Sequence, residues 1–121
     1  MKYRVFNKKF WSTIEELVNQ SEITIDRPKG SSHPRIPELI YPVDYGYLKG
    51  TTSFDGNEVD IWKGTKDAFS IDGVVCTVDL AKKDTEMKIL ISCTEEEMQM
   101  IYTLHNEKSM SAILIKRDEA Q

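Results

Sequence analysis

Residues 55–60 read Asp-Gly-Asn-Glu-Val-Asp and concentrate oxygen-bearing side chains within one short segment. The initial Asp-Gly pair is typical of a turn, and strand alternation after it places Glu58 and Asp60 on one face and Val59 on the other. A carboxylate inside a strand of a small domain is costly unless it is paired or bound to a metal. Clustered oxygen ligands suit hard cations such as Mg²⁺. The segment predicts a cation site, with a solvated turn before an amphipathic strand as the alternative.

A second group of charges surrounds the junction between two apolar runs and includes Asp79, Asp84, Glu86 and Lys88. In an extended chain, the last three of these side chains share one face. A carboxylate pair beside an ammonium suits a metal-bridged phosphate. The alternative is a charged hairpin between two strands.

A proline-rich stretch carries a third group, made of Lys29, Arg35, Tyr41, Tyr45 and Tyr47. A rigid loop with cations and tyrosine hydroxyls would hold an anion. The alternative is that the tyrosines are core aromatics whose hydroxyl tips reach water.

Neither the cysteines nor the histidines have a spacing typical of zinc ligands. Cys76 and Cys93 lie in apolar, strand-like segments, which favours buried thiols over a disulfide. His33 and His105 lie far apart in the sequence, and we interpret each as structural or solvent-facing.

Composition limits the possible partners. The chain has 121 residues, which is room for one core, so we expect residues 1–121 to form a single domain. Its net charge of −4 argues against broad nucleic-acid binding. No apolar run approaches the ~20 residues of a membrane helix, and the N-terminal segment lacks the apolar region of a signal peptide. We therefore expect a cytoplasmic protein that binds neither nucleic acid nor membrane.

Hydrophobic periodicity predicts an α+β domain with a helix near each end. The first helix spans 10–20, with a capping box between Ser12 and Glu15, and the second spans 94–105, with a capping box between Thr94 and Glu97. Strand-like segments lie at 22–26, 45–48, 58–62, 72–80, 87–92 and 111–116. We expect about five short antiparallel strands to curl into a small β-barrel, because closure removes open edges.

Read in order, these segments resemble the family I soluble inorganic pyrophosphatases. The resemblance rests on Ile-Asp-Arg-Pro-Lys-Gly-Ser at 25–31, on Tyr-Pro-Val-Asp-Tyr-Gly-Tyr at 41–47, and on Asp-Gly-Asn-Glu-Val-Asp-Ile at 55–61. The second and third are similar to the family's Y-P-x-N-Y-G-Y and D-x-D-x-x-D patterns, and 84–88 looks like its later D-x-K element. The resemblance covers roughly residues 22–92 and implies a short, divergent member with a five-stranded OB-like barrel.

The resemblance implies several Mg²⁺ ions, with Mn²⁺ as a substitute, and a small phosphorylated substrate. The residues at metal-ligand positions are Asp55, Asp60 and Glu86, with Asp84 and Asp79 as further candidates. A second set matches positions at the substrate: Tyr45 matches a tyrosine at the site, Lys88 a phosphate-binding lysine, and Arg35 another such lysine, with Lys29 beside it. Asp26 sits near a family glutamate. We take Asn57, Asp60 and Tyr45 as the catalytic positions.

The chain departs from the family pattern at the position that matters most for turnover. Asn57 stands where the family has the middle aspartate, which helps deprotonate the attacking water. An amide cannot accept that proton, although Glu58 lies close enough in sequence to replace part of the missing charge. The chain also lacks one arginine and has no Tyr-Lys pair near its C-terminus, since Thr103 follows Tyr102.

Two functions follow from these expectations. The first is Mg²⁺-dependent hydrolysis of inorganic pyrophosphate, or of a related small phosphoanhydride, to phosphate. The alternative is a catalytically weakened or silent barrel that binds phosphate or a nucleotide. A single-strand nucleic-acid module is disfavoured by the acidic balance. The resemblance also implies a homo-oligomer.

Overall fold

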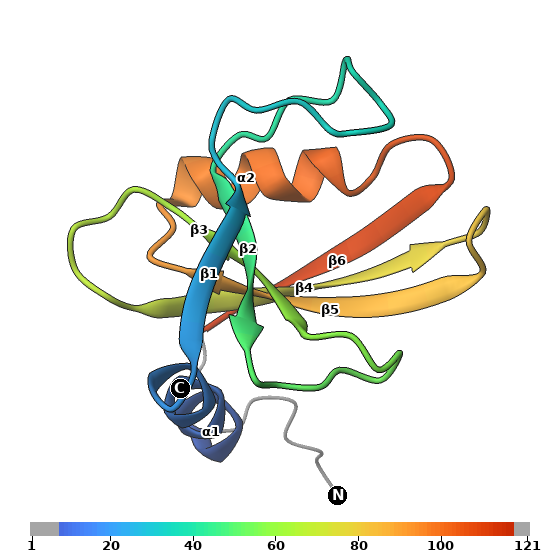
Figure 1. The fold of residues 1–121 in the computed structure, drawn as a ribbon. Helices are drawn as coiled ribbons and strands as arrows, with labels where there is room; N and C mark the ends of the chain where they lie inside the picture. Colours follow the sequence, from blue (N-terminus) through green and yellow to red (C-terminus); the bar gives the residue numbers. More distant parts are fainter. Residues whose placement is uncertain (1–7, 118–121) are drawn as a thin grey trace, which may run out of the picture.

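The computed structural model describes residues 8–117, which form two helices and one mixed sheet (Figure 1). The elements in chain order are α1 (Lys8–Asn19), β1 (Glu22–Arg27), β2 (Asp44–Lys49), β3 (Val59–Lys63), β4 (Ile71–Asp79), β5 (Asp84–Ile91), α2 (Glu95–Leu104) and β6 (Met110–Lys116). The six strands lie in the order β1-β2-β3-β5-β4-β6. Only β3 and β5 pair in parallel, and every other neighbouring pair is antiparallel.

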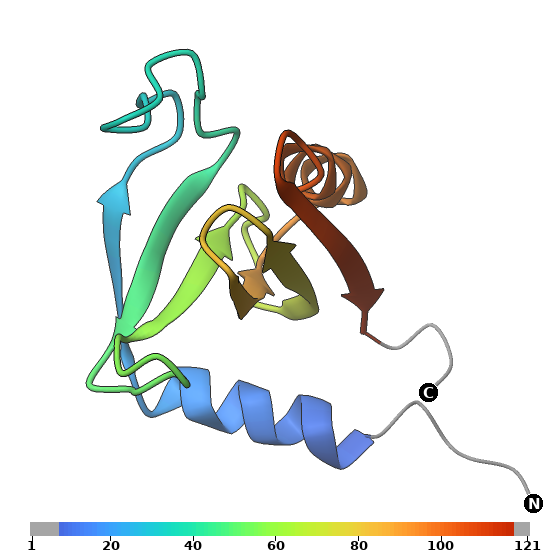
Figure 2. The same cartoon turned by 90° about the vertical axis from the view of Figure 1, so that its right-hand side faces the viewer.

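The sheet is open, so the predicted five-stranded OB-like barrel is wrong in closure and in strand number, whereas the α+β class is confirmed. The edge strands β1 and β6 lie on opposite sides of the molecule in Figure 2. Strands β1–β3 cross the direction of β4–β6 steeply, as Figure 1 shows. Because α1 covers one face and α2 covers part of the other, both apolar faces are buried without closing the sheet.

The helix boundaries test the two predicted capping boxes. The one at Thr94 is confirmed, because its hydroxyl accepts from the Glu97 N–H at 3.1 Å while the Glu97 carboxylate accepts from the Thr94 N–H at 2.9 Å. The one at Ser12 is wrong, because α1 already begins at Lys8 and the Ser12 hydroxyl donates to the Lys9 carbonyl inside the helix. Within residues 8–117, neither helix has the length and apolar character needed to cross a membrane.

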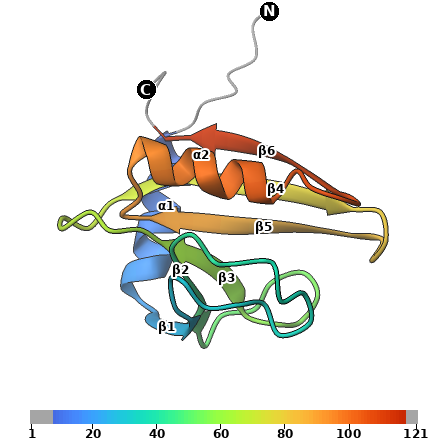
Figure 3. The same cartoon turned by 90° about the horizontal axis from the view of Figure 1, so that it is seen from above.

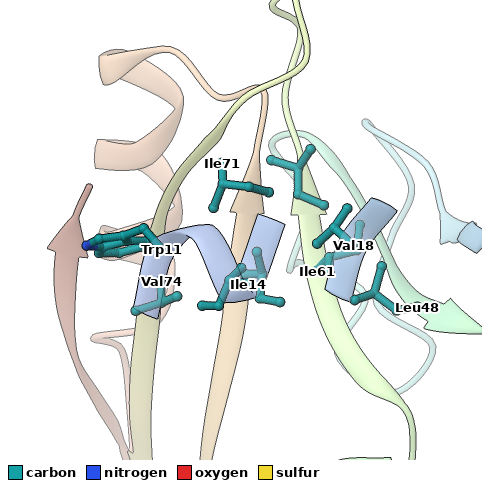
Figure 4. Packing of buried hydrophobic residues seen from close by; sticks show 9 residues of the cluster. Trp11, Ile14, Val18, Leu48, Ile61, Ile71 and Val74 are labelled. Atoms are coloured by element: carbon teal, nitrogen blue, oxygen red, sulfur yellow. The ribbon is translucent and has the colours of Figure 1, made fainter. Parts of the chain in front are cut away.

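Helix α1 packs on the sheet through a single apolar stripe. Trp11, Ile14 and Val18 are buried and repeat at the spacing of an amphipathic helix. Figure 4 shows this stripe lying against buried side chains from β2, β3 and β4, among them Leu48, Ile61, Ile71 and Val74. The α1 core therefore anchors the strands that carry the predicted site residues.

The second core lies beneath α2 and extends from β4–β6 to Trp62 of β3 and to Tyr41 and Val43 before β2. Figure 3 shows α2 over the β4–β6 half of the sheet. Trp62 is 1% exposed, and its indole N–H donates to His105 Nε2 at 3.1 Å. His105 is therefore neutral with its proton on Nδ1, which lies 3.3 Å from Met110 Sδ. Burial, helped by the charge of Lys88, lowers the pKa of His105 to about 4. Of the two interpretations that the sequence left open for His105, structural or solvent-facing, the structure supports the first.

The buried neutral His105 predicts a loss of stability in mild acid. Between pH 6.5 and 4 the unfolded chain binds a proton at this histidine and the folded chain does not, so the unfolding free energy falls as the pH falls. The expected loss is up to about 3 kcal/mol. Urea unfolding at pH 7.5 and pH 5 measures it. The variant His105→Gln, which keeps an acceptor for Trp62, is expected to show a flatter dependence, and parallel curves for the two proteins would contradict the assignment.

The two cysteines are free thiols, as predicted. Cys93 is buried and Cys76 is half-buried. Burial raises the pKa of the Cys93 thiol to about 12, so it is protonated at neutral pH. Neither thiol has the lowered pKa of a reactive cysteine.

Candidate functional site

Three neighbouring strands, β2, β3 and β5, bring the predicted site residues together. Tyr45 of β2 lies opposite Trp62 of β3, and Tyr47 lies opposite Asp60 in the same ladder. Between the two tyrosines, Gly46 packs so closely on β1 that an added Cβ would lie 1.9 Å from the Thr24 carbonyl oxygen. A glycine at this position is thus required for the β1–β2 pairing that presents Tyr45.

An ammonium group lies at the centre of the site. Lys88 Nζ donates to the Tyr45 hydroxyl at 2.7 Å, to Asp60 Oδ2 at 3.1 Å and to Glu86 Oε1 at 2.6 Å. The Tyr45 hydroxyl donates in turn to Asp60 Oδ2 at 2.7 Å. The Lys88 side chain is 6% exposed, whereas those of Asp60 and Glu86 are 34% and 30% exposed. We refer to Tyr45, Asp60, Glu86 and Lys88 as the Lys88 cluster.

The charges of the Lys88 cluster follow from its contacts. Burial alone would lower the pKa of the Lys88 ammonium, but Tyr45 and the Asp60 and Glu86 carboxylates together outweigh it and hold that pKa above its usual value. Burial raises the pKa of Tyr45, although the nearby ammonium opposes the rise. At neutral pH the cluster therefore holds a neutral tyrosine and one negative charge in excess, from two carboxylates against one ammonium.

The hydrogen-bonding capacity of Lys88 is fully used. An ammonium has three N–H donors, and Tyr45, Asp60 and Glu86 each accept one. A phosphate oxygen can therefore bind Lys88 only after one of these bonds breaks. In this arrangement the lysine orients the two carboxylates towards each other.

Asp55 lies in the loop before β3 and is held by that loop. Its Oδ1 accepts from the Ser53 hydroxyl at 2.6 Å and from the Asn57 backbone N–H at 3.0 Å. The Asn57 side-chain amide lies 3.4 Å from Asp55 Oδ2. These bonds, the one from Ser53 foremost, lower the pKa of Asp55, which stays ionised and exposed. Asp55 is therefore an available anion that faces its own turn.

One hollow of about 740 Å³ nevertheless joins the acidic segment 55–60 to β5. Asp55, Asp60 and Glu86 all border it, together with a larger number of uncharged residues from β4, β5 and β6. The segment 55–60 and the β5 residue Glu86 thus border one place on the surface. Asp60 and Glu86 make the closer pair, because they share the Lys88 ammonium.

Asp79 and Asp84 lie at the far end of the β4–β5 hairpin, where they face each other in the register. Asp79 Oδ1 accepts from the N–H groups of Ala81 and Lys82 and from the Ser109 hydroxyl, at 2.9, 3.2 and 2.8 Å. Asp79 therefore closes the hairpin turn. Neither aspartate is among the residues that border the hollow in the described part of the chain.

Comparison with known proteins shows which fold positions this cluster. No protein-family model matches the chain, and no curated protein matches it in sequence. Solved structures do match in fold, and three of them are described. An inorganic pyrophosphatase from Coxiella burnetii aligns with a TM-score of 0.57 and 13% identity over 79% of this chain and 84% of that chain. The chain has the fold of the inorganic pyrophosphatases.

Two further structures give the same result. A protein described as an inorganic phosphatase from Anaplasma phagocytophilum aligns with a TM-score of 0.54 and 15% identity, over 79% of this chain and 82% of that one. The inorganic pyrophosphatase from Helicobacter pylori aligns with a TM-score of 0.54 and 13% identity, over 80% and 83%. At these identities the similarity establishes the pyrophosphatase fold, and the roles of individual residues must be argued from their own contacts.

The metal expected from the pyrophosphatase resemblance has to fit the residues present. Among residues 8–117, no three His, Cys, Asp or Glu side chains are grouped closely enough to form a metal cage. Two partly exposed carboxylates do converge, from Asp60 and Glu86. Mg²⁺ commonly binds through one or two protein carboxylates together with substrate phosphates. The donor set therefore fits an ion that arrives with a phosphate, and it does not fit a preassembled cluster of several ions.

The other two predicted substrate residues, Lys29 and Arg35, are exposed and belong to the loop between β1 and β2. Figure 1 shows this loop at the top of the molecule. The Lys29 backbone N–H donates to Asp44 Oδ1 at 2.8 Å, and the Arg35 backbone N–H donates to His33 Nδ1 at 3.0 Å. These bonds fix the backbone of the loop. Neither side chain contacts the Lys88 cluster in the described part of the chain.

Sequence reasoning missed Arg27, the last residue of β1. Its Nη1 donates to the Tyr41 hydroxyl, and its guanidinium lies 5.6 Å from the Tyr41 ring centroid and 5.9 Å from that of Tyr45. An irregularity between Ile25 and Arg27 shifts the register and sets Arg27 opposite Tyr45. The only signal in the sequence was its position inside the 25–31 motif, which does not reveal the register shift.

Proposed function

We propose that this protein is a slow, Mg²⁺-dependent hydrolase of inorganic pyrophosphate or a related small phosphoanhydride. The observation that carries the proposal is the convergence of the Asp60 and Glu86 carboxylates beside the Tyr45 hydroxyl, on strands of a pyrophosphatase fold. A hollow large enough for a small phosphorylated molecule borders this pair.

The charge of the Lys88 cluster explains why a divalent cation is needed. With one negative charge in excess, the cluster repels a free phosphate anion. Asp60 and Glu86 would hold the ion through the carboxylate oxygens that do not contact Lys88. When bound, Mg²⁺ would neutralise part of the phosphate charge and would lower the pKa of the water molecule that it binds.

The chain's own groups then position the substrate. Tyr45 is a neutral hydroxyl at neutral pH and is held by two hydrogen bonds, so its location next to the carboxylates is defined. Lys88 keeps Asp60 and Glu86 oriented towards each other. Besides Asp60 and Glu86, no described carboxylate contacts this cluster to act as a base. Asn57 cannot accept a proton, although it stands where the family has an aspartate. Slow turnover is the expected consequence.

A silent phosphate-binding protein is the second candidate, and it is favoured by the loop around Asp55. There the carboxylate is occupied by Ser53 and Asn57 instead of facing the Lys88 cluster. Such a site would retain Mg²⁺–phosphate binding without hydrolysis. Calorimetry that shows binding of Mg²⁺ with a non-hydrolysable diphosphonate, in a protein without phosphate release, would identify this case.

Phosphate release from pyrophosphate tests the main proposal. At high protein concentration and pH 8–9, we expect release in Mg²⁺ and none in EDTA. Asp60→Asn is expected to remove most of the activity, whereas Asp67→Asn, at an exposed position in the loop between β3 and β4, is the matched control and is expected to keep it. Release that stays at the no-enzyme level would exclude the hydrolase, and equal loss in both variants would mean that Asp60 has no special role.

A further inference from the structure

We propose that Arg27 is the residue that anchors the anionic substrate beside Tyr45, a role that the resemblance gives to Lys88, Arg35 and Lys29. This inference rests on the proposed function, because it names the cation that the phosphorylated substrate meets first. The ligand class is a small diphosphate or diphosphonate bound together with Mg²⁺.

The first argument is the number of free donors on each cation. Lys88 has no spare N–H, because its three donors bind Tyr45, Asp60 and Glu86. Arg27 has five N–H donors, and its side chain makes one hydrogen bond to the described part of the chain, from Nη1 to the Tyr41 hydroxyl. Within residues 8–117, no carboxylate lies within ion-pair distance of its guanidinium. Arg27 is thus the half-buried cation next to the site with donors left for an anion.

The second argument is that the guanidinium is already held in place. Tyr41 is 4% exposed, so its hydroxyl is a fixed acceptor for Arg27. The guanidinium also lies against the rings of Tyr41 and Tyr45. Holding the side chain before binding reduces the conformational entropy lost when a ligand is bound. A planar guanidinium also matches two phosphate oxygens at once, which an ammonium cannot do.

The third argument is position. Arg27 Cζ and Lys88 Nζ lie 5.9 Å and 5.1 Å from the centroid of the same Tyr45 ring. Arg27 is not among the described residues that border the hollow, so the proposed ligand extends from the carboxylate pair past the Tyr45 ring to meet it. Free phosphate can occupy one of these places, whereas a molecule with two phosphorus centres can reach both. This arrangement favours a diphosphate over orthophosphate.

Arg35 is the natural comparison, because it carries the same group. Its side chain is exposed, and among residues 8–117 no side-chain hydrogen bond or ring contact holds it. Ordering such a side chain on binding costs free energy that Arg27 does not lose. Arg35→Gln is therefore the matched control for Arg27→Gln.

Calorimetric titration with methylenediphosphonate in the presence of Mg²⁺ tests the inference without requiring turnover. Arg27→Gln is expected to weaken binding about tenfold or more, and Arg35→Gln less than about threefold. Arg27→Lys keeps the charge and the apolar stem, and it is expected to recover only part of the affinity. The apparent melting temperature of each variant is measured in parallel, so that Arg27→Lys decides the matter if Arg27→Gln does not fold.

The outcomes separate this inference from the proposed function. Binding that depends on Arg27 in a protein that releases no phosphate would support the anchor and reject the hydrolase. Phosphate release with an unchanged KM in Arg27→Gln and Arg27→Lys would support the hydrolase and overturn the anchor. Affinity unchanged in both Arg27 variants, a larger loss in Arg35→Gln, or no binding by the wild-type protein would also overturn it.

Discussion

Replacing Asn57 by Asp is expected to raise the Mg²⁺-dependent rate of pyrophosphate hydrolysis by about ten- to a hundredfold. A well-placed acid or base contributes ~10²–10⁴-fold, and the exposed loop holds the new carboxylate less firmly, so the expected gain lies at or below the lower end of that range. The Asn57 amide lies 3.4 Å from Asp55 Oδ2, so a carboxylate there would add a proton acceptor next to a second carboxylate. Initial rates of phosphate release at saturating Mg²⁺ measure the effect.

The same substitution is expected to make the stability of the folded protein depend on the Mg²⁺ concentration. Without the ion, the new carboxylate repels Asp55, because it replaces an amide that now faces it. The melting temperature of Asn57→Asp should therefore be lower than wild-type in EDTA and should rise more steeply with Mg²⁺. Asn57→Ala, which removes the amide without adding charge, is expected to show neither the faster hydrolysis nor the steeper rise of the melting temperature with Mg²⁺. A rate at or below wild-type for Asn57→Asp would mean that position 57 does not serve the attacking water.

Replacing Lys88 by Met is expected to lower the unfolding free energy by about 2–3 kcal/mol in EDTA. Removing one partner of a fully buried ion pair commonly costs 3–5 kcal/mol, and partial exposure of Asp60 and Glu86 reduces that figure. Methionine keeps most of the side-chain volume, so the loss reports on charge. Urea unfolding measures it. The control is Lys66→Met, which removes a more exposed ion pair with Asp72 and is expected to cost less than about 1 kcal/mol.

Magnesium is expected to restore part of the stability lost in Lys88→Met. The two carboxylates that share the ammonium are left without a counter-ion, and a divalent cation can take its place. The stabilisation by Mg²⁺ should therefore be larger in Lys88→Met than in wild-type or Lys66→Met. Equal stabilisation of all three proteins would show that Asp60 and Glu86 do not act as a cation-binding pair.

Two features of the wild-type site weaken its binding of a free cation, and the variants Lys88→Met and Asn57→Asp each remove one of them. Lys88 already neutralises part of the charge that a metal would neutralise, which limits the affinity of the unmodified site for a free ion. Asn57 leaves the neighbouring loop with one negative charge fewer than an aspartate at position 57 would give. Both features point to a site that recruits its cation together with the phosphate, and they explain why the gain expected for Asn57→Asp depends on Mg²⁺ concentration.

Local sequence rules determined most of the secondary structure and part of the site. All six strand-like segments became strands, and the capping box at Thr94 formed as expected. Strand alternation correctly placed Asp84, Glu86 and Lys88 on one face of β5, because this depends only on the pleat. Such features involve residues within a few positions of each other, and their energetics do not depend on the rest of the chain.

Tertiary structure decided which of those residues meet. The parallel pairing of β3 with β5 brings Asp60 to Glu86 and Lys88, the irregularity in β1 turns Arg27 towards Tyr45, and two covering helices leave the sheet open. Asp79 was diverted into a hairpin turn by hydrogen bonds to its own loop and to Ser109. The physical reason is that strand register and helix packing are set by hydrogen bonds and apolar contacts between distant segments, which periodicity within one segment does not specify.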